Sequence, residues 1–142
     1  MADERLENWR RCWRAAAGVL ARNELEALRA GLLLDDRCLL QGATTEPPPL
    51  MVCQDWPVEA CCPLAYAGWQ CCLTTVAEVE EFFARVCHEI DEALGEPAGC
   101  RWLLNWIDET PRAAMIAALL PEVETALAKP DAMKGTSDGS NG

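Results

Sequence analysis

The segment 74–95, TTVAEVEEFFARVCHEIDEALG, is the strongest indication of the fold because it carries a complete helix pattern. Its apolar residues recur every three or four positions, the spacing that places side chains on one face of an α-helix. Thr75 followed by Glu78 forms a capping box at the start, and Gly95 supplies a stop at the end. We therefore predict one long amphipathic helix whose apolar face packs on a hydrophobic core.

Helical spacing also recurs in the segments on either side of this one. Asn23 followed by Glu26 has the pattern of a capping box and would start a second helix, while Pro121 would kink or divide the last one. The sequence predicts a single compact all-α domain of about five or six helices over residues 1–128. The expected helices outside 74–95 cover residues 3–21, 23–32, 57–69, 98–109 and 110–127.

The stretch 42–50, GATTEPPPL, interrupts the helical pattern because three consecutive prolines favour an extended chain. Short strands at 37–40 (RCLL) and 50–53 (LMVC) would flank this loop as a small β-hairpin. Residues 129–142 are polar, glycine-rich and without periodicity, which predicts a disordered C-terminal tail. The expected domain thus combines helices with one irregular, proline-containing segment.

Charge is unevenly distributed along the chain, whose formal net charge is −11. Between Cys38 and Cys100, ten carboxylates stand against a single basic side chain, Arg85. Such a chain lacks the excess of lysines and arginines over acidic residues that neutralises a nucleic-acid backbone or attaches to an anionic membrane surface. We therefore expect neither direct nucleic-acid binding nor membrane binding.

The first residues, MADERLENWRRCWR (1–14), are charged from the third position and contain no apolar segment of the kind a secretory signal requires. The longest uncharged run, 60–77, just reaches the length of a membrane span, but proline, glycine and polar residues interrupt it. These features predict a cytoplasmic protein.

Two surfaces are candidates for binding another protein. The first helix combines tryptophans with arginines, and both residue types are enriched at interface hot spots; packing in the core is the alternative use of the tryptophans. The long helix offers a row of glutamates, which is either a solvated surface or a site for a partner with a basic patch. The candidate interaction residues are Trp9, Arg10, Trp13, Arg14, Glu78, Glu81, Glu89 and Glu92.

The nine cysteines include two adjacent pairs, Cys61–Cys62 and Cys71–Cys72. The sequence has no Cys-x-x-Cys unit, which would bring two thiolates to one metal, and an odd number of cysteines without a secretory signal argues against a disulfide framework. We therefore expect most of them to fill the core as small apolar residues. The alternatives are a redox-active thiol, or a zinc or iron–sulfur site gathered from Cys53, Cys62, Cys71 or Cys72, and Cys100.

His88 is the only histidine, and Asp91 and Glu92 lie one turn further along the same helix. These three groups could hold a metal or transfer protons, but a solvated histidine beside two acids is the simpler interpretation. No nucleophile elbow, phosphate-binding glycine loop or His-Glu-x-x-His motif occurs. We therefore expect no enzymatic activity and no cofactor.

Three functions are compatible with these features, in decreasing order of support. The first is a non-enzymatic, acidic cytoplasmic protein that binds or regulates another protein. The second is a cysteine-based metal-binding or redox-sensing module. The third is an inhibitor that occupies the site of a nucleic-acid-binding protein by imitating phosphate charges with carboxylates. The sequence specifies neither the partner nor the oligomeric state.

Overall fold

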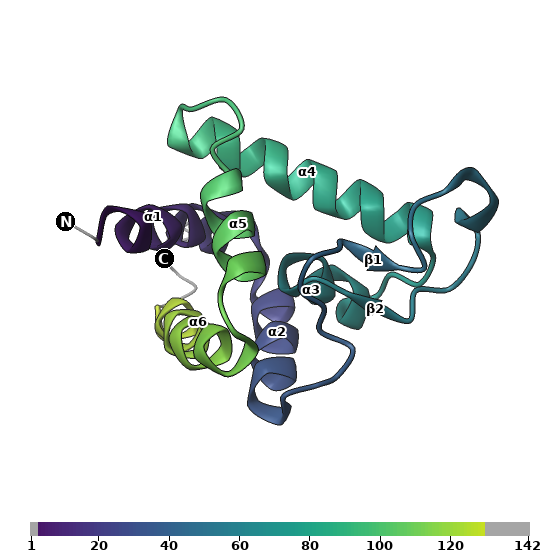
Figure 1. Cartoon of the computed structure of the whole chain (residues 1–142), viewed down its shortest axis with the longest axis horizontal. Helices are drawn as coiled ribbons and strands as arrows, with labels where there is room; N and C mark the ends of the chain where they lie inside the picture. The colour runs from purple at the N-terminus through teal and green to yellow at the C-terminus, as the bar shows by residue number, and fades with distance from the viewer. Residues whose placement is uncertain (1–2, 130–142) are drawn as a thin grey trace, which may run out of the picture.

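The computed structural model describes residues 3–129, with side chains from Asn8 onward. This part of the chain forms six α-helices, one 3₁₀ helix and a two-stranded sheet (Figure 1), so the predicted all-α fold with a small hairpin is confirmed. In chain order the elements are α1 (Asp3–Val19), α2 (Arg22–Leu34), β1 (Thr45–Glu46), η1 (Met51–Cys53), β2 (Ala60–Cys61), α3 (Pro63–Cys71), α4 (Val76–Leu94), α5 (Arg101–Glu109) and α6 (Arg112–Ala128).

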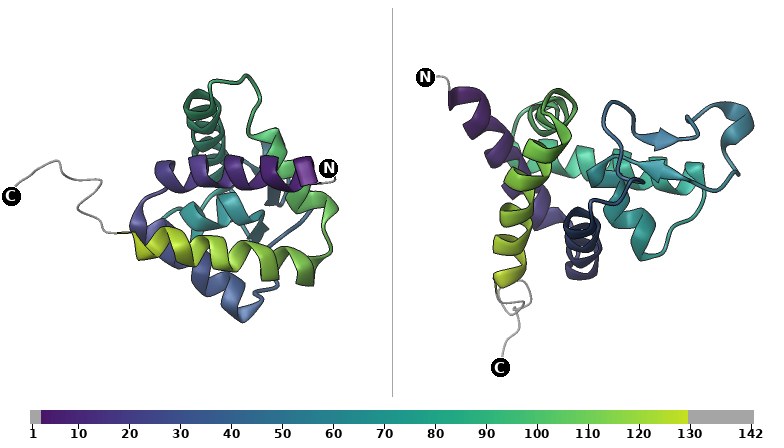
Figure 2. Two further views of the ribbon diagram at one scale, coloured as in Figure 1. Left: turned by 90° about the vertical axis from the view of Figure 1, so that its left-hand side faces the viewer. Right: turned by 60° about the horizontal axis from the view of Figure 1, so that its bottom comes forward.

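One continuous hydrophobic core joins the helices. α1 packs against α4 and α5, α2 packs against α3 and α6, and α3 packs against α4. α1 and α6 lie side by side and run in the same direction (Figure 2), so Arg14 reaches Glu122 while Arg22 reaches the carbonyl of Leu127 further along. The small sheet and its long loop project from the opposite side of the molecule (Figure 1).

The long helix predicted from the sequence is α4. The Thr75 hydroxyl accepts from the Glu78 N–H at 3.3 Å, and the Glu78 carboxylate accepts from the Thr75 N–H at 3.2 Å, as the capping box predicts. Gly95 follows the last turn with φ 68°, in the left-handed region that glycine adopts without a steric penalty. Local residues therefore set both ends of α4.

Two glycines allow α3 to sit close to its neighbours. A Cβ atom on Gly31 of α2 would lie 2.5 Å from the Tyr66 ring, and one on Gly68 of α3 would lie 2.6 Å from the Phe82 ring. Neither distance is compatible with a methyl group, because protein interiors are packed to near-crystalline density. The absence of a side chain at these positions fixes how closely α2, α3 and α4 approach one another.

The small sheet exists, but its strands differ from those expected at 37–40 and 50–53. β1 and β2 pair antiparallel, with Thr45 opposite Cys61 and Glu46 opposite Ala60. The pairing ends at Glu46 because the prolines that follow have no N–H to donate to a ladder. Segment 50–53 instead contains the 3₁₀ helix η1.

The predicted helix over 57–69 was wrong in its first half. Ala60–Cys61 form strand β2, and the helix begins only at Pro63, whose fixed φ and missing N–H suit the first position of a helix. Pro63 therefore starts this helix.

Two other boundaries also differ from expectation. α2 begins one residue before Asn23, and it is Glu24, rather than Glu26, whose carboxylate accepts from a backbone N–H, that of Ala21 at 2.9 Å. α6 continues through Pro121 without a division. Its buried positions pack on the core along the helix, and tertiary packing can override a local breaker.

Among the described residues, no helix combines the length and apolar composition that a membrane crossing requires. The last helix ends at Ala128. The predicted tail over 129–142 lies, apart from Lys129, outside the described residues.

Candidate interaction surface

The two tryptophans predicted as interface anchors lie inside the core. Trp9 and Trp13 are 0% and 1% exposed. Trp9 stacks on Trp106 of α5, with ring centroids 3.6 Å apart and an interplanar angle of 3°. The predicted aromatic anchor is therefore not presented to a partner, because its rings join α1 to the rest of the core.

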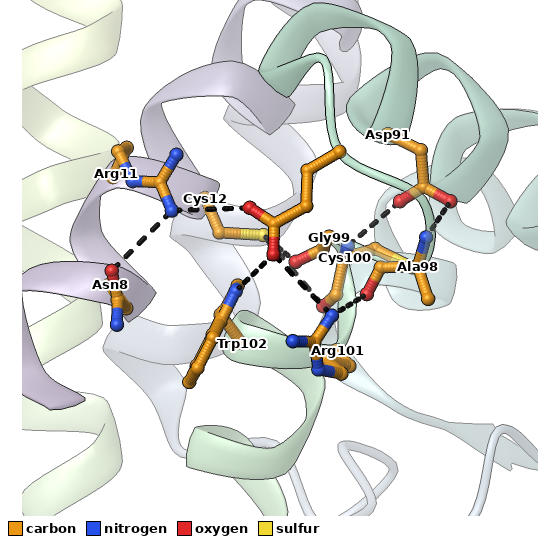
Figure 3. A network of polar contacts seen from close by, with 10 residues as sticks. Asn8, Arg11, Cys12, Asp91, Ala98, Gly99, Cys100, Arg101 and Trp102 are labelled. Carbon is orange, nitrogen blue, oxygen red and sulfur yellow. Dashed lines mark hydrogen bonds and ion pairs between the residues drawn. The ribbon is translucent and has the colours of Figure 1, made fainter.

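The arginines of α1 contact other parts of the same chain. Arg10 and Arg14 lie 3.4 Å and 3.3 Å from the carboxylate of Glu122 on α6, and Arg11 lies 3.5 Å from Glu96 (Figure 3). The predicted basic surface of α1 is thus neutralised within the fold. Ion pairs of this exposed kind contribute little stability each, but they determine which charges are left for a partner.

A polar network fixes the turn between α4 and α5 (Figure 3). Glu96 accepts from Trp102 Nε1 at 3.1 Å and lies 3.5 Å from Arg101, and these contacts, the tryptophan bond foremost, hold the pKa of this carboxyl below its usual value. Asp91 accepts from two backbone N–H groups of the turn, including that of Cys100 at 2.8 Å. Two of the ten central carboxylates, Asp91 and Glu96, therefore hold the turn between α4 and α5.

The glutamates predicted as an acidic face on α4 differ in how far they are neutralised. Glu78 caps the helix, and the backbone N–H groups that it accepts from hold its pKa below the usual value. Glu89 lies 4.0 Å from Arg85, and Glu92 lies 3.4 Å from the lone histidine. Of these four, only Glu81 is exposed and without a partner among the described residues.

Four carboxylates among residues 8–129 have neither a side-chain hydrogen bond nor an ion pair, and all four are exposed. Every other acidic side chain in that range has a partner. Three of the four belong to the segment that runs from β1 to β2, and one lies in the second turn of α4. They are Glu46, Asp55, Glu59 and Glu81.

We call residues 46–59 together with 76–82 the acidic edge. The two segments touch at the start of α4, where Val76 and Ala77 donate their N–H groups to the carbonyls of Trp56 and Gln54, at 2.9 Å and 3.0 Å. The first N–H groups of a helix have no partner inside the helix. These two hydrogen bonds therefore provide acceptors for the first N–H groups of α4, and they also fix the backbone of the loop.

A second attachment holds the other end of this loop. Thr45 is buried, and its hydroxyl lies 3.0 Å from the carbonyl of Pro47 and 3.0 Å from the carboxylate of Glu80 on α4. Cys53, at the centre of the loop, is also buried. The loop is thus anchored at both ends and in the middle.

The side chains of the same loop point largely into solvent. Leu50, Met51, Val52 and Trp56 are 58%, 88%, 72% and 51% exposed, and they account for four of the six large apolar side chains that are exposed among the described residues. The loop projects beyond the helices at one end of the molecule (Figure 1). Exposed apolar clusters on a folded protein mark interaction sites more often than isolated apolar residues do.

The four cysteines considered as an alternative metal site are not brought together. Within residues 8–129, whose side chains the structure describes, no group of three or more His, Cys, Asp and Glu side chains is placed to hold a metal ion. Cys62 and Cys71 stand at opposite ends of α3, which separates them by about 13 Å at 1.5 Å per residue. Cys71 instead accepts from the side-chain amide of Asn23 at 2.8 Å. The candidate set with Cys53 and Cys100 is therefore not assembled in this fold.

All nine cysteines lie in the described part of the chain and are free thiols. Burial raises the pKa of Cys12 to about 11 and that of Cys62 to about 12, and it also raises the pKa of Cys61 and Cys87. A thiol must ionise to act as a nucleophile. These four side chains contact the core, as expected for small apolar residues.

Comparisons of this chain with models of protein families, with curated proteins and with solved structures found no match. The fold and surface define a small, mainly helical protein with an acidic edge and an apolar loop. The sequence analysis identified Glu81 as a candidate interaction residue, but it did not predict that the apolar side chains of residues 50–56 are exposed. The sequence does carry an indication of it, since Leu50, Met51 and Val52 follow three prolines without any periodic partner.

Proposed function

We propose that this chain is a non-enzymatic protein-interaction protein that binds a basic patch on another protein through its acidic edge. The observation that carries the proposal is the position of Glu46, Asp55, Glu59 and Glu81, the four exposed carboxylates without a partner in the described part of the chain. Unneutralised charge on one side of a protein steers a partner of opposite charge toward that side.

The distribution of arginines supports the same surface. The described arginines of α1, α2 and α6 pair with acidic groups, as Arg14 does with Glu122 and Arg29 with Glu124, so negative charge there is compensated. No described arginine pairs with the four free carboxylates of the acidic edge. A basic partner would consequently gain more by binding at this edge than on the opposite side of the molecule.

The alternative functions have less support from the geometry. Arg85 and His88 are exposed on α4 between Glu81 and Glu92, so the helix does not present the uninterrupted row of negative charge that phosphate mimicry needs. A thiol-based sensor would need an ionisable cysteine, whereas burial raises the pKa of several thiols. We therefore place protein interaction first.

The proposal can be tested with an oligolysine peptide as the basic probe, measured by fluorescence anisotropy at several salt concentrations. Binding should weaken steadily as salt is added, because exposed charges are screened over about 10 Å at 0.1 M. The double variant Glu59→Lys/Glu81→Lys should bind the peptide about tenfold more weakly, since each reversal replaces an attraction by a repulsion.

The matched control is Glu26→Lys/Glu124→Lys, which makes the same change in net charge away from the acidic edge. Both of these glutamates are exposed and already lie near arginines. We expect this variant to retain most of the binding. An equal loss in the two variants would show that only overall charge matters and would contradict a specific site.

A further inference from the structure

We infer that residues 50–56 form an apolar docking ridge for a partner segment that combines apolar side chains with Lys or Arg, a proposal that rests on the proposed basic partner and specifies its chemistry. The ridge consists of the exposed side chains of Leu50, Met51, Val52 and Trp56. Residues 54–56 are bonded to the start of α4, so the ridge and the unpaired carboxylates belong to one edge.

Anchoring of the loop backbone distinguishes this ridge from a flexible apolar segment. The carbonyls of Gln54 and Trp56 accept from α4, the carbonyl of Leu50 accepts from the Cys53 N–H at 2.8 Å and from the Gln54 side chain at 3.2 Å, and Cys53 is buried. A surface that is already ordered loses less conformational entropy when it binds. Trp is a common hot-spot residue, and Met adapts its shape to irregular pockets.

The acidic groups around the ridge determine which kind of partner fits. Asp55 lies within the loop, and Glu46 and Glu59 flank it at the two strands. A second copy of this chain would bring the same carboxylates together, and like charges placed close to one another oppose binding. An anionic membrane surface is disfavoured for the same reason. In a basic segment with apolar side chains, the apolar groups can pack on the ridge while Lys or Arg pairs with the surrounding carboxylates.

The test uses two synthetic peptides of about 18 residues. The first contains leucine and lysine with the leucines at helical spacing, and the second has serine in place of each leucine with the lysines unchanged. The wild-type protein should bind the leucine peptide about tenfold more tightly than the serine peptide. In Met51→Ser/Val52→Ser this preference should disappear, while binding of the serine peptide stays the same.

The matched control is Leu33→Ser/Leu34→Ser, which removes the other pair of large exposed apolar side chains, 51% and 79% exposed at the end of α2. This variant should keep the full preference for the leucine peptide. An equal loss of preference in both variants would overturn the ridge. Circular dichroism should show the same unfolding temperature for both variants as for the wild type, which would exclude a folding defect.

The remaining outcomes separate the ridge from the proposed function. If neither peptide binds, the basic-partner proposal fails and the ridge fails with it. If both peptides bind equally and Met51→Ser/Val52→Ser changes nothing, the ridge alone is overturned. If the wild type sediments as a dimer and Met51→Ser/Val52→Ser sediments as a monomer, the ridge binds a second copy of this chain and the proposal is overturned. Ridge-dependent binding to phosphatidylcholine vesicles, without a preference between the peptides, would assign it to a membrane.

Discussion

The junction of α1, α5 and α6 and the acidic edge use the same residue types in opposite ways. At the junction, Trp9 is fully buried against Trp106, and Glu122 of α6 is surrounded by arginines. At the acidic edge, Trp56 is half exposed and Glu81 has no partner among the described residues. At the junction, apolar and charged side chains contact other parts of the same chain. At the acidic edge, the corresponding side chains are exposed to solvent.

This difference separates the region whose contacts stabilise the fold from the region that we propose for binding. Burial of apolar area is the main favourable contribution to folding, so exposed apolar side chains contribute little to it. Four such side chains on an anchored loop are the basis of the docking ridge that we propose. Four substitutions test this comparison, in decreasing order of expected effect on the free energy of unfolding.

Trp9→Ala should destabilise the protein by about 3–5 kcal/mol, because it leaves a large cavity and removes the stack on Trp106. Urea denaturation followed by circular dichroism measures this loss. Trp56→Ala is the matched control at the acidic edge and should change the free energy of unfolding by less than about 1 kcal/mol. Similar losses at the two positions would contradict the contrast between the two regions.

Tyr66→Phe should reduce stability by about 1–3 kcal/mol at neutral pH, because the hydroxyl donates to the carboxylate of Asp36 at 2.6 Å. This bond is the main cause that lowers the pKa of Asp36 in the folded protein. A lowered folded pKa stabilises the protein above the unfolded pKa, and that stabilisation is lost as the pH falls through the folded value.

The difference in the free energy of unfolding between the wild type and Tyr66→Phe should therefore become smaller as the pH falls below about 4. Urea denaturation at a series of pH values measures this difference. Trp9→Ala serves as the control because its destabilisation involves no titrating group. That destabilisation should change much less over the same pH range. A constant gap for Tyr66→Phe would show that the hydroxyl does not act through the carboxylate.

Thr45→Val should destabilise the protein by about 1 kcal/mol, since valine matches threonine in shape but cannot bond to Glu80 or to the carbonyl of Pro47. Hydrogen exchange should become faster at the amides of Val76 and Ala77, which donate to the loop. Unchanged exchange at these amides would indicate that Thr45 does not help to hold the loop.

Met51→Ser/Val52→Ser should leave the free energy of unfolding within about 0.5 kcal/mol of the wild type, the smallest effect of the four. Thermal denaturation measures it. A loss of several kcal/mol would mean that these exposed side chains stabilise the fold itself, and the contrast between the two regions would then fail.

The elements whose determinants are local could be predicted closely. The capping box at Thr75 and the stop at Gly95 placed α4 within one residue of its observed ends. The hairpin strands were misplaced because strand pairing joins distant segments, such as Thr45 with Cys61. Burial of Trp9 could not be distinguished from exposure, since the apolar stripe of α1 does not indicate which helix covers it.

The mainly helical fold, the acidic central segment and the absence of a close-spaced cysteine motif could all be recognised from the sequence, because periodicity, charge and spacing are properties of neighbouring residues. Which charged side chains remain without a partner depends on the packing of distant segments. Arg14 and Glu122 are 108 positions apart in the chain, and their pairing follows from the packing of α1 beside α6. The same packing leaves Glu81 unpaired beside an anchored apolar loop, since none of the described arginines of α1, α5 and α6 contacts that edge.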